Sequence, residues 1–135
     1  MPLKTIYIIS FCLFLITGCA SLSEVKQEEL FETASFSYEQ ALVFGKYEAA
    51  HSFTKVAAQE EHVTDLKRLK KIKVTAYELI ALKVSKDRNI VNQRVEIRYY
   101  YLDSMVEKTI IDNQLWRYEP EETIWYLESG LPDFK

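Results

Sequence analysis

The spacing of apolar residues takes three successive forms along this chain of 135 residues. An apolar run, with Ser10 inside it, extends from Ile6 to Ile16. Apolar residues then recur every three or four positions as far as Leu69, which places them on one face of a helix. From Ile72 onward they alternate with polar residues, the period of a strand with one buried face. The pattern predicts helices first and strands afterwards, the order of an α+β domain.

The helical region divides into three segments. A Ser-x-x-Glu capping box from Ser21 to Glu24 predicts the start of the first helix. Gly45 predicts its end, because glycine adopts the left-handed conformation that closes a helix. A second, shorter helix is expected over residues 47–53. A third is indicated by three apolar residues at helical spacing, Val63, Leu66 and Leu69.

Four strands are expected to follow as an antiparallel meander. The first extends from Ile72 to Val84, and Glu78 interrupts its apolar row, which predicts a bulge or a strand end there. The second and third cover residues 91–102 and 106–118, and residues 123–128 form the last. The turns between them are expected at residues 86–89, 103–104 and 119–122. The sequence therefore predicts helices packed on a curved, four-stranded antiparallel sheet.

The apolar run near the start has the features of an export signal. Lys4 precedes it, and it ends in Ile16-Thr17-Gly18-Cys19, which resembles the lipobox of bacterial lipoproteins. With about eleven residues the run is shorter than the roughly 20 that span a membrane, so a retained transmembrane helix is the weaker alternative. An ordinary cleaved signal more often ends in an A-x-A-like site. The resemblance implies a signal peptide over residues 1–18 and a diacylated Cys19 at the mature N-terminus.

The residues after Cys19 bear on location. In enterobacteria an Asp at the next position retains a lipoprotein in the inner membrane, and Ala20 stands there instead. This favours a lipid anchor in the outer membrane of a bacterial envelope, facing the periplasm. Residues 19–23 are then expected to form a lipidated tether, and residues 24–135 a single domain.

The cysteine count and the charge exclude several classes of function. Cys12 lies in the discarded run and Cys19 carries the lipid, so the folded part has no disulfide, thiolate metal site or cysteine nucleophile. Loss of Lys4 leaves 16 basic and 20 acidic side chains, a net charge of −4. Nucleic-acid binding usually requires a basic face, so we expect no nucleic-acid partner.

Two segments of the mature chain carry a resemblance to a known superfamily. The helix stop Gly45-Lys46-Tyr47-Glu48-Ala49-Ala50 and the late Leu115-Trp116-Arg117-Tyr118 resemble the NTF2-like (nuclear-transport-factor-2-like) superfamily. Lys46 stands where that superfamily usually has Asp. The resemblance covers residues 24–134 and implies N-terminal helices in the concavity of a curved sheet, a cone with a pocket at its open end. A cystatin-like single helix on a sheet is the alternative, and three helical segments count against it.

Few residues carry recognisable chemistry. His51 and His62 are the only histidines, and their spacing does not match a metal-ligand pair, so no metal and no cofactor are expected. Enzymes of the resembled superfamily, such as steroid isomerases and dehydratases, place Asp, Tyr or His in the pocket. Glu78 is the candidate pocket carboxylate, because apolar surroundings would raise its pKa and make it a base. A strand-edge carboxylate in water is the alternative.

Aromatic residues are dense in the strands. Packing within the core or on a sheet face explains most of them. A surplus on the outer face of the sheet would indicate a ligand site, a protein partner or a homodimer through that face. The candidate contact residues are Tyr100, Trp116, Tyr118, Trp125 and Tyr126. The segment from Leu131 to Phe134 either packs across the cone or docks to a partner.

Two functional classes follow from these observations. The preferred one is a membrane-anchored, non-catalytic module that binds a protein or a small apolar ligand as an accessory or assembly subunit. The alternative is an enzyme of the steroid-isomerase or dehydratase type that uses a pocket carboxylate. An enzyme requires polar groups that converge inside the cone, so Glu78 and both histidines on the outside would count against it.

Overall fold

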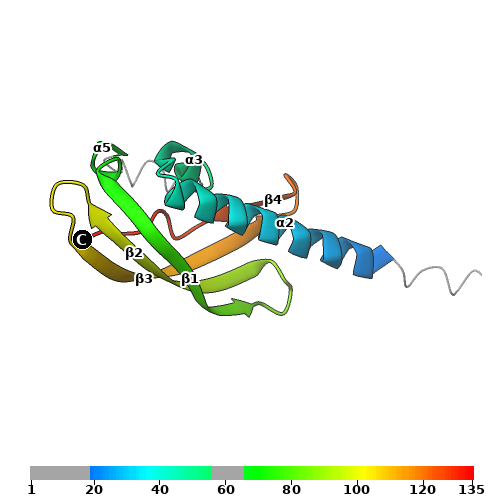
Figure 1. Cartoon of the computed structure of the whole chain (residues 1–135). Helices are drawn as coiled ribbons and strands as arrows, with labels where there is room; N and C mark the ends of the chain where they lie inside the picture. Colours follow the sequence, from blue (N-terminus) through cyan, green and yellow to red (C-terminus); the bar gives the residue numbers. More distant parts are fainter. Residues whose placement is uncertain (1–18, 56–65) are drawn as a thin grey trace, which may run out of the picture.

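The computed structural model describes residues 19–55 and 66–135, and Figure 1 shows their arrangement. The predicted signal peptide, His62 and the start of the predicted third helix lie outside the described residues. The helices are α2 (Cys19–Val43), α3 (Tyr47–His51) and α5 (Leu66–Leu69). The strands are β1 (Ile72–Val84), β2 (Ile90–Tyr101), β3 (Glu107–Glu119) and β4 (Ile124–Leu127).

The four strands form one curved antiparallel sheet in the order β1-β2-β3-β4, and α2 crosses one face of it (Figure 1). The predicted α+β class and the meander are therefore confirmed, in an arrangement consistent with an NTF2-like or a cystatin-like fold. We call the face of the sheet that packs against α2 the inner face, and the opposite one the outer face.

Helix α2 begins at Cys19, whereas a tether was expected over residues 19–23. The segment from Cys19 to Val43 contains no Gly or Pro. No helix-breaking residue therefore stops the helix from extending upstream of Ser21, where the capping box predicts its start. Its end is the predicted one. Gly45 has a φ of 67°, its amide donates to Leu42 O at 3.1 Å, and the Lys46 amide donates to Ala41 O at 2.7 Å. These two bonds form a Schellman motif, which satisfies carbonyls at the helix end.

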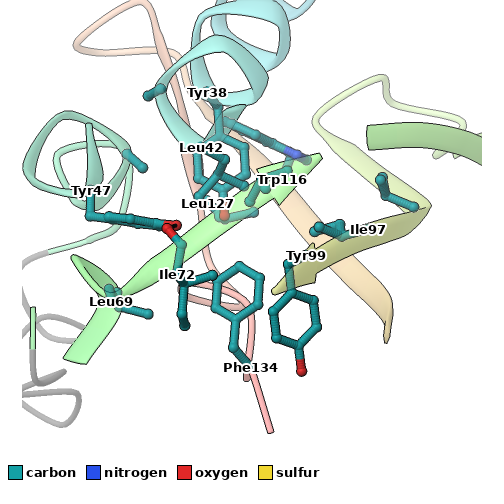
Figure 2. Packing of buried hydrophobic residues seen from close by; sticks show 14 of the residues in the cluster. Tyr38, Leu42, Tyr47, Leu69, Ile72, Ile97, Tyr99, Trp116, Leu127 and Phe134 are labelled. Atoms are coloured by element: carbon teal, nitrogen blue, oxygen red, sulfur yellow. Dashed lines mark hydrogen bonds between the residues drawn. The ribbon is translucent and has the colours of Figure 1, made fainter. Parts of the chain in front are cut away.

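The core lies between the inner face of the sheet and the helices, and Figure 2 shows its packing. Tyr38 and Leu42, one helical turn apart on α2, are both fully buried. The Tyr38 ring meets the buried indole of Trp116 edge-on, with the centroids 5.5 Å apart. Tyr47 of α3 is also buried, and its hydroxyl donates to Ile72 O at 3.0 Å. The long helix and α3 are thus attached to the sheet through aromatic side chains.

The last residues of the sequence pack across the opposite end of the sheet from the start of α2 (Figure 1). Phe134 is 1% exposed, and its ring lies edge-on to Tyr99, with a centroid distance of 4.8 Å. The Tyr99 hydroxyl donates to Lys135 O at 2.6 Å, and the Tyr101 hydroxyl donates to Phe134 O at 3.2 Å. Of the two alternatives for this segment, the structure shows packing.

Strand β1 contains two register shifts relative to β2, one at Thr75 and one at Ile80. Each inserts an extra residue, which reverses the face to which the following side chains point. Glu78 lies between them, so the predicted bulge near Glu78 is confirmed. The inner-face residues of β1 are those that pair with the buried row of β2: Ile72, Val74, Tyr77, Leu79, Leu82 and Val84.

Candidate binding cleft

A cleft of about 430 Å³ lies between the N-terminal half of α2 and the β1–β2 hairpin. Helix α2 contributes the Phe31 ring, and the hairpin contributes Leu82, Val84 and Val91. Trp125 of β4 also lines it. On the sheet side of this part, which we call the outer part, these apolar residues lie together with Ser85, Lys86 and Arg88.

The cleft continues along α2 into an inner part of about 350 Å³. The two parts adjoin, since Phe31, Glu32 and Leu82 line both of them. Residues that line the inner part and not the outer part include the apolar and aromatic side chains of Phe36, Tyr77 and Leu79. The buried amide side chain of Gln93 lines it as well. Volumes of this size are in the range of sites that hold one small molecule.

The cleft is open because β1 is an edge strand. The sheet order ends at β1, so among the described residues no strand pairs with its free edge, and its inner-face side chains have neighbours in the sheet on one side alone. Leu79, Leu82 and Val84 are 50%, 46% and 47% exposed, although they belong to the face that is buried elsewhere in the sheet. Burial of such apolar surface stabilises a complex by about 25 cal/mol per Å². A group of exposed apolar residues in a concave place is typical of a binding site.

Hydrogen bonds hold the two walls of the cleft at a fixed separation. The Trp125 indole N–H donates to Gln27 O of α2 at 3.0 Å. The Gln27 side-chain amide donates to Arg88 O at 2.7 Å and to Asn89 Oδ1 at 3.0 Å, in the β1–β2 turn. Helix, hairpin and β4 are thus joined at the outer end, which makes the cleft a preformed feature.

Acidic side chains line the α2 side of the cleft. Glu24, Glu28 and Glu32 follow one another at intervals of four residues, and Glu39 extends the row into the inner part. Arg88 lies 3.9 Å from Glu24 and 3.7 Å from Glu28 at the outer end. Within the described residues, Glu32 and Glu39 form no ion pair. Burial raises the pKa of Glu39 above its ordinary value.

A polar network lies on the inner face of the sheet beside the cleft. The Gln114 side-chain amide donates to Asp112 Oδ2 at 2.8 Å and to the Tyr77 hydroxyl at 2.9 Å, and the Trp116 indole donates to Gln114 Oε1 at 3.2 Å. Burial raises the pKa of Asp112, and the hydrogen bond from Gln114 opposes this. Burial also raises the pKa of the Tyr77 hydroxyl. The Asp112 carboxyl is consequently harder to ionise than an aspartate in water.

Two buried polar atoms next to this network have no hydrogen-bond partner among the described residues. They are the hydroxyl oxygen of Tyr38 and Oε1 of Gln93. Burial also raises the pKa of Tyr38 well above its ordinary value. Gln93 is 7% exposed and lines the inner part of the cleft. Since buried acceptors are nearly always paired, Gln93 is a candidate contact for a ligand.

The structure places the predicted carboxylate, Glu78, outside the cleft. Glu78 pairs with Glu96 across β1 and β2, on the outer face, and its side chain is exposed. The reason is the register shift at Thr75, which turns Tyr77 and Leu79 inward and Glu78 outward. The surroundings of Glu78 are therefore those of a strand-surface carboxylate. On the inner face, the half-buried carboxylate of Asp112 belongs to the polar network described above.

The five predicted aromatic contact residues separate into different environments. Trp125 lines the cleft, and Tyr118 is half-buried with its ring 5.3 Å from that of Trp125. Trp116 is fully buried in the core. Tyr126 is buried beneath the Lys55 ammonium, which lies 4.1 Å from the ring centroid. Tyr100 is half-buried on the outer face, in register with Lys73 and Glu107.

The sequence pattern contained signals for the residues that were missed. Asp112 and Gln114 are in phase with Trp116 on a strand of period two, so they share its buried face. Gln93 is in phase with Val91 and Val95 in the same way. Glu24, Glu28 and Glu32 of α2 recur every four positions, which places them on one helix face.

The remaining predictions concern His51, a metal site and a membrane-spanning helix. His51 ends α3 and is half-buried. No group of three or more His, Cys, Asp or Glu side chains within residues 19–55 and 66–135 has the geometry to hold a metal ion. Over those same residues, no helix combines the length and the apolar character needed to cross a membrane. No protein-family model matches the sequence, and comparisons with curated proteins and with solved structures found no match.

Proposed function

We propose that this protein is a lipid-anchored bacterial envelope protein whose domain binds an apolar ligand in the cleft between α2 and the β1–β2 hairpin, without catalysing a reaction. The observation that carries the proposal is the exposed inner-face row of Leu79, Leu82 and Val84 opposite Phe31. The lipobox resemblance at Cys19 supports the anchor, in the outer membrane and facing the periplasm.

The position of the cleft agrees with an anchored binding module. Helix α2 begins at Cys19, and the same helix supplies one wall of the cleft from Glu24 onward. Burial of acyl chains on Cys19 in the membrane would contribute about 0.8 kcal/mol of binding free energy per CH₂ and hold the molecule there. The ligand site would then lie on the helix that the lipid holds at the membrane surface.

Site-specific photocrosslinking in cells tests the binding site. A benzophenone amino acid replaces Leu82 in the cleft or, as a matched control, Ile111 on the outer face. The two side chains are 46% and 41% exposed. After irradiation of intact cells, we expect an adduct at position 82 and none at position 111, and the mass of the adduct distinguishes a small molecule from a protein. Equal crosslinking at both positions, or none at position 82, would contradict the proposed site.

The anchor is tested separately. We expect Cys19→Ala to abolish metabolic labelling with an alkyne fatty acid and to leave the signal segment uncleaved, as seen by the mass of the purified protein. Separation of inner and outer membranes on a density gradient tests the proposed location. An unlabelled but correctly cleaved wild-type protein would show that the segment is an ordinary signal peptide.

One observation favours the second candidate, an enzyme of the steroid-isomerase or dehydratase type. The half-buried carboxyl of Asp112 is linked to the Tyr77 hydroxyl through the Gln114 amide, and its raised pKa suits a general base. Asp112 does not line either part of the cleft, however, which is why binding is preferred. Loss of turnover of a steroid-like ketone in Asp112→Asn, with an unchanged Leu82 photoadduct, would favour the enzyme.

A further inference from the structure

The charges in the inner part of the cleft are of one sign. Glu32 and Glu39 line it, and none of the residues that line it is Lys or Arg. The two cations that line the cleft, Lys86 and Arg88, belong to its outer part, where Arg88 lies beside Glu24 and Glu28. An anionic ligand in the inner part would therefore meet two carboxylates without a counter-charge. A cationic ligand would supply the charge that the described residues do not supply there.

The buried amide of Gln93 is an independent observation that points to a hydrogen-bond donor. Its Oε1 is buried and has no partner among the described residues, and Gln93 is one of the residues that line the inner part. An acceptor in this state gains a hydrogen bond when a ligand brings an N–H group. The hydroxyl of Tyr38, a core residue, also has no partner in the part of the chain that the structure describes.

Aromatic and aliphatic side chains complete the inner part. Phe31, Phe36 and Tyr77 present rings, and Leu79 and Leu82 present aliphatic surface. Such a lining suits the apolar body of a ligand, and ring faces also attract a cation. With about 350 Å³ in this part, the site holds one small molecule.

We propose that the inner part of the cleft binds a small amphiphilic amine: a protonated amine with N–H donors directed at Gln93 and balanced by Glu32 and Glu39, on an apolar body that packs against Phe31 and Leu82. This inference rests on the proposed function, because it names the ligand class of the same cleft. It adds the sign of the ligand's charge and the requirement for N–H donors.

Three probes of matched shape test the inference on the full-length lipidated protein in phosphatidylcholine nanodiscs. They are 2-phenylethylammonium, its N,N,N-trimethyl analogue and 3-phenylpropionate. Isothermal titration at neutral pH, corrected with empty nanodiscs, gives the three affinities. We expect the primary amine to bind about tenfold more tightly than the trimethyl analogue, because the latter has no N–H for Gln93. We expect no measurable binding of the carboxylate.

Variants connect these affinities to the named residues. Glu32→Gln should lower the affinity for the primary amine by up to about fivefold, which is the effect expected of one partly exposed charge. Glu29→Gln removes the same charge from the same helix, but Glu29 does not line the cleft, so it should leave the affinity unchanged. Gln93→Leu should remove the preference for the primary over the trimethyl amine.

The possible results separate this inference from the proposed function. Equal or tighter binding of 3-phenylpropionate would overturn the charge argument, yet it would support an apolar binding cleft. Equal effects of Glu32→Gln and Glu29→Gln would show that the charge acts at long range and not in the site, which would also overturn it. Failure of all three probes to bind overturns the inference, and the photocrosslinking at position 82 then decides the proposed function alone.

Discussion

Replacement of Phe134 tests whether the last residues belong to the core. The ring is buried and meets Tyr99 and Tyr47 edge-on, at centroid distances of 4.8 and 6.5 Å. Truncation of a buried Phe to Ala generally costs about 3–5 kcal/mol. We expect the lower end, about 3 kcal/mol, because a segment near the end of the described chain can partly collapse into the space. This is a large share of the roughly 5–15 kcal/mol that stabilises a domain.

The assay is urea unfolding of the full-length protein in detergent micelles, followed by the fluorescence of the buried Trp116. With a slope of about 2 kcal/mol per molar urea, the loss lowers the midpoint of Phe134→Ala by about 1.5 M. Asp133→Ala is the matched control, because Asp133 is exposed and its ion pair with Lys135, at 3.7 Å, is exposed too. That variant should unfold within about 0.3 M of the wild type. Similar midpoints for both variants would refute the core position of Phe134 and favour a docking segment.

Backbone conformation and the half-buried carboxyl of Asp112 give three more expectations. Gly45→Ala should destabilise the domain by about 1 kcal/mol in the same urea assay. The φ of Gly45 is 67°, and the added Cβ would meet only Tyr47 Cε2, at 3.9 Å, so the cost comes from the backbone conformation and not from a clash. Thr123→Gly, at a φ of 58°, should stabilise it, and a loss of stability would show that the turn tolerates Thr without strain. Burial raises the pKa of Asp112, so the folded state retains a proton that the unfolded state releases, and stability falls as pH rises from the ordinary value of 3.8 through the folded pKa. Asp112→Asn should therefore stabilise the protein more at pH 7 than at pH 4 in urea unfolding, and an equal effect at both would contradict the raised pKa.

The central strands could be predicted from the sequence because buried residues recur at every second position along β2 and at Gln114 and Trp116 of β3. The expected strand over residues 91–102 corresponds to β2 from Ile90 to Tyr101, and that over residues 106–118 corresponds to β3 from Glu107 to Glu119. A regular alternation of buried and exposed side chains leaves little freedom in register or in boundaries. The glycine stop at Gly45 was predictable for a local reason, since the left-handed conformation favours that residue.

Strand β1 shows where the pattern misleads. Its apolar residues at even positions looked like a single row broken by Glu78, but the bulges at Thr75 and Ile80 reverse the phase between them. The inner face therefore takes Tyr77 and Leu79 from the odd positions. A bulge depends on pairing with the neighbouring strand, which a single sequence does not display.

The cleft could not be predicted because it depends on tertiary position. Whether Leu82 is covered or exposed is decided by β1 being the edge of the sheet and by the path of α2 beside it. Likewise, Trp116 and Trp125 have similar sequence surroundings, yet one is enclosed in the core and the other lines the cleft. Period and composition indicate which residues avoid water, and the packing of elements far apart in the chain decides which of them a ligand can reach.

The continuity of α2 from Cys19 into the wall of the cleft limits where the site can work. An α-helix rises about 1.5 Å per residue, so Phe31 lies at most about 18 Å from the backbone of Cys19, whatever the tilt of the helix. A flexible segment after Cys19 would let the domain take many distances from its anchor, whereas a helix fixes that distance. If Cys19 carries the acyl chains, the site is confined to a thin layer above the headgroups, and any ligand from farther away has to be delivered into that layer.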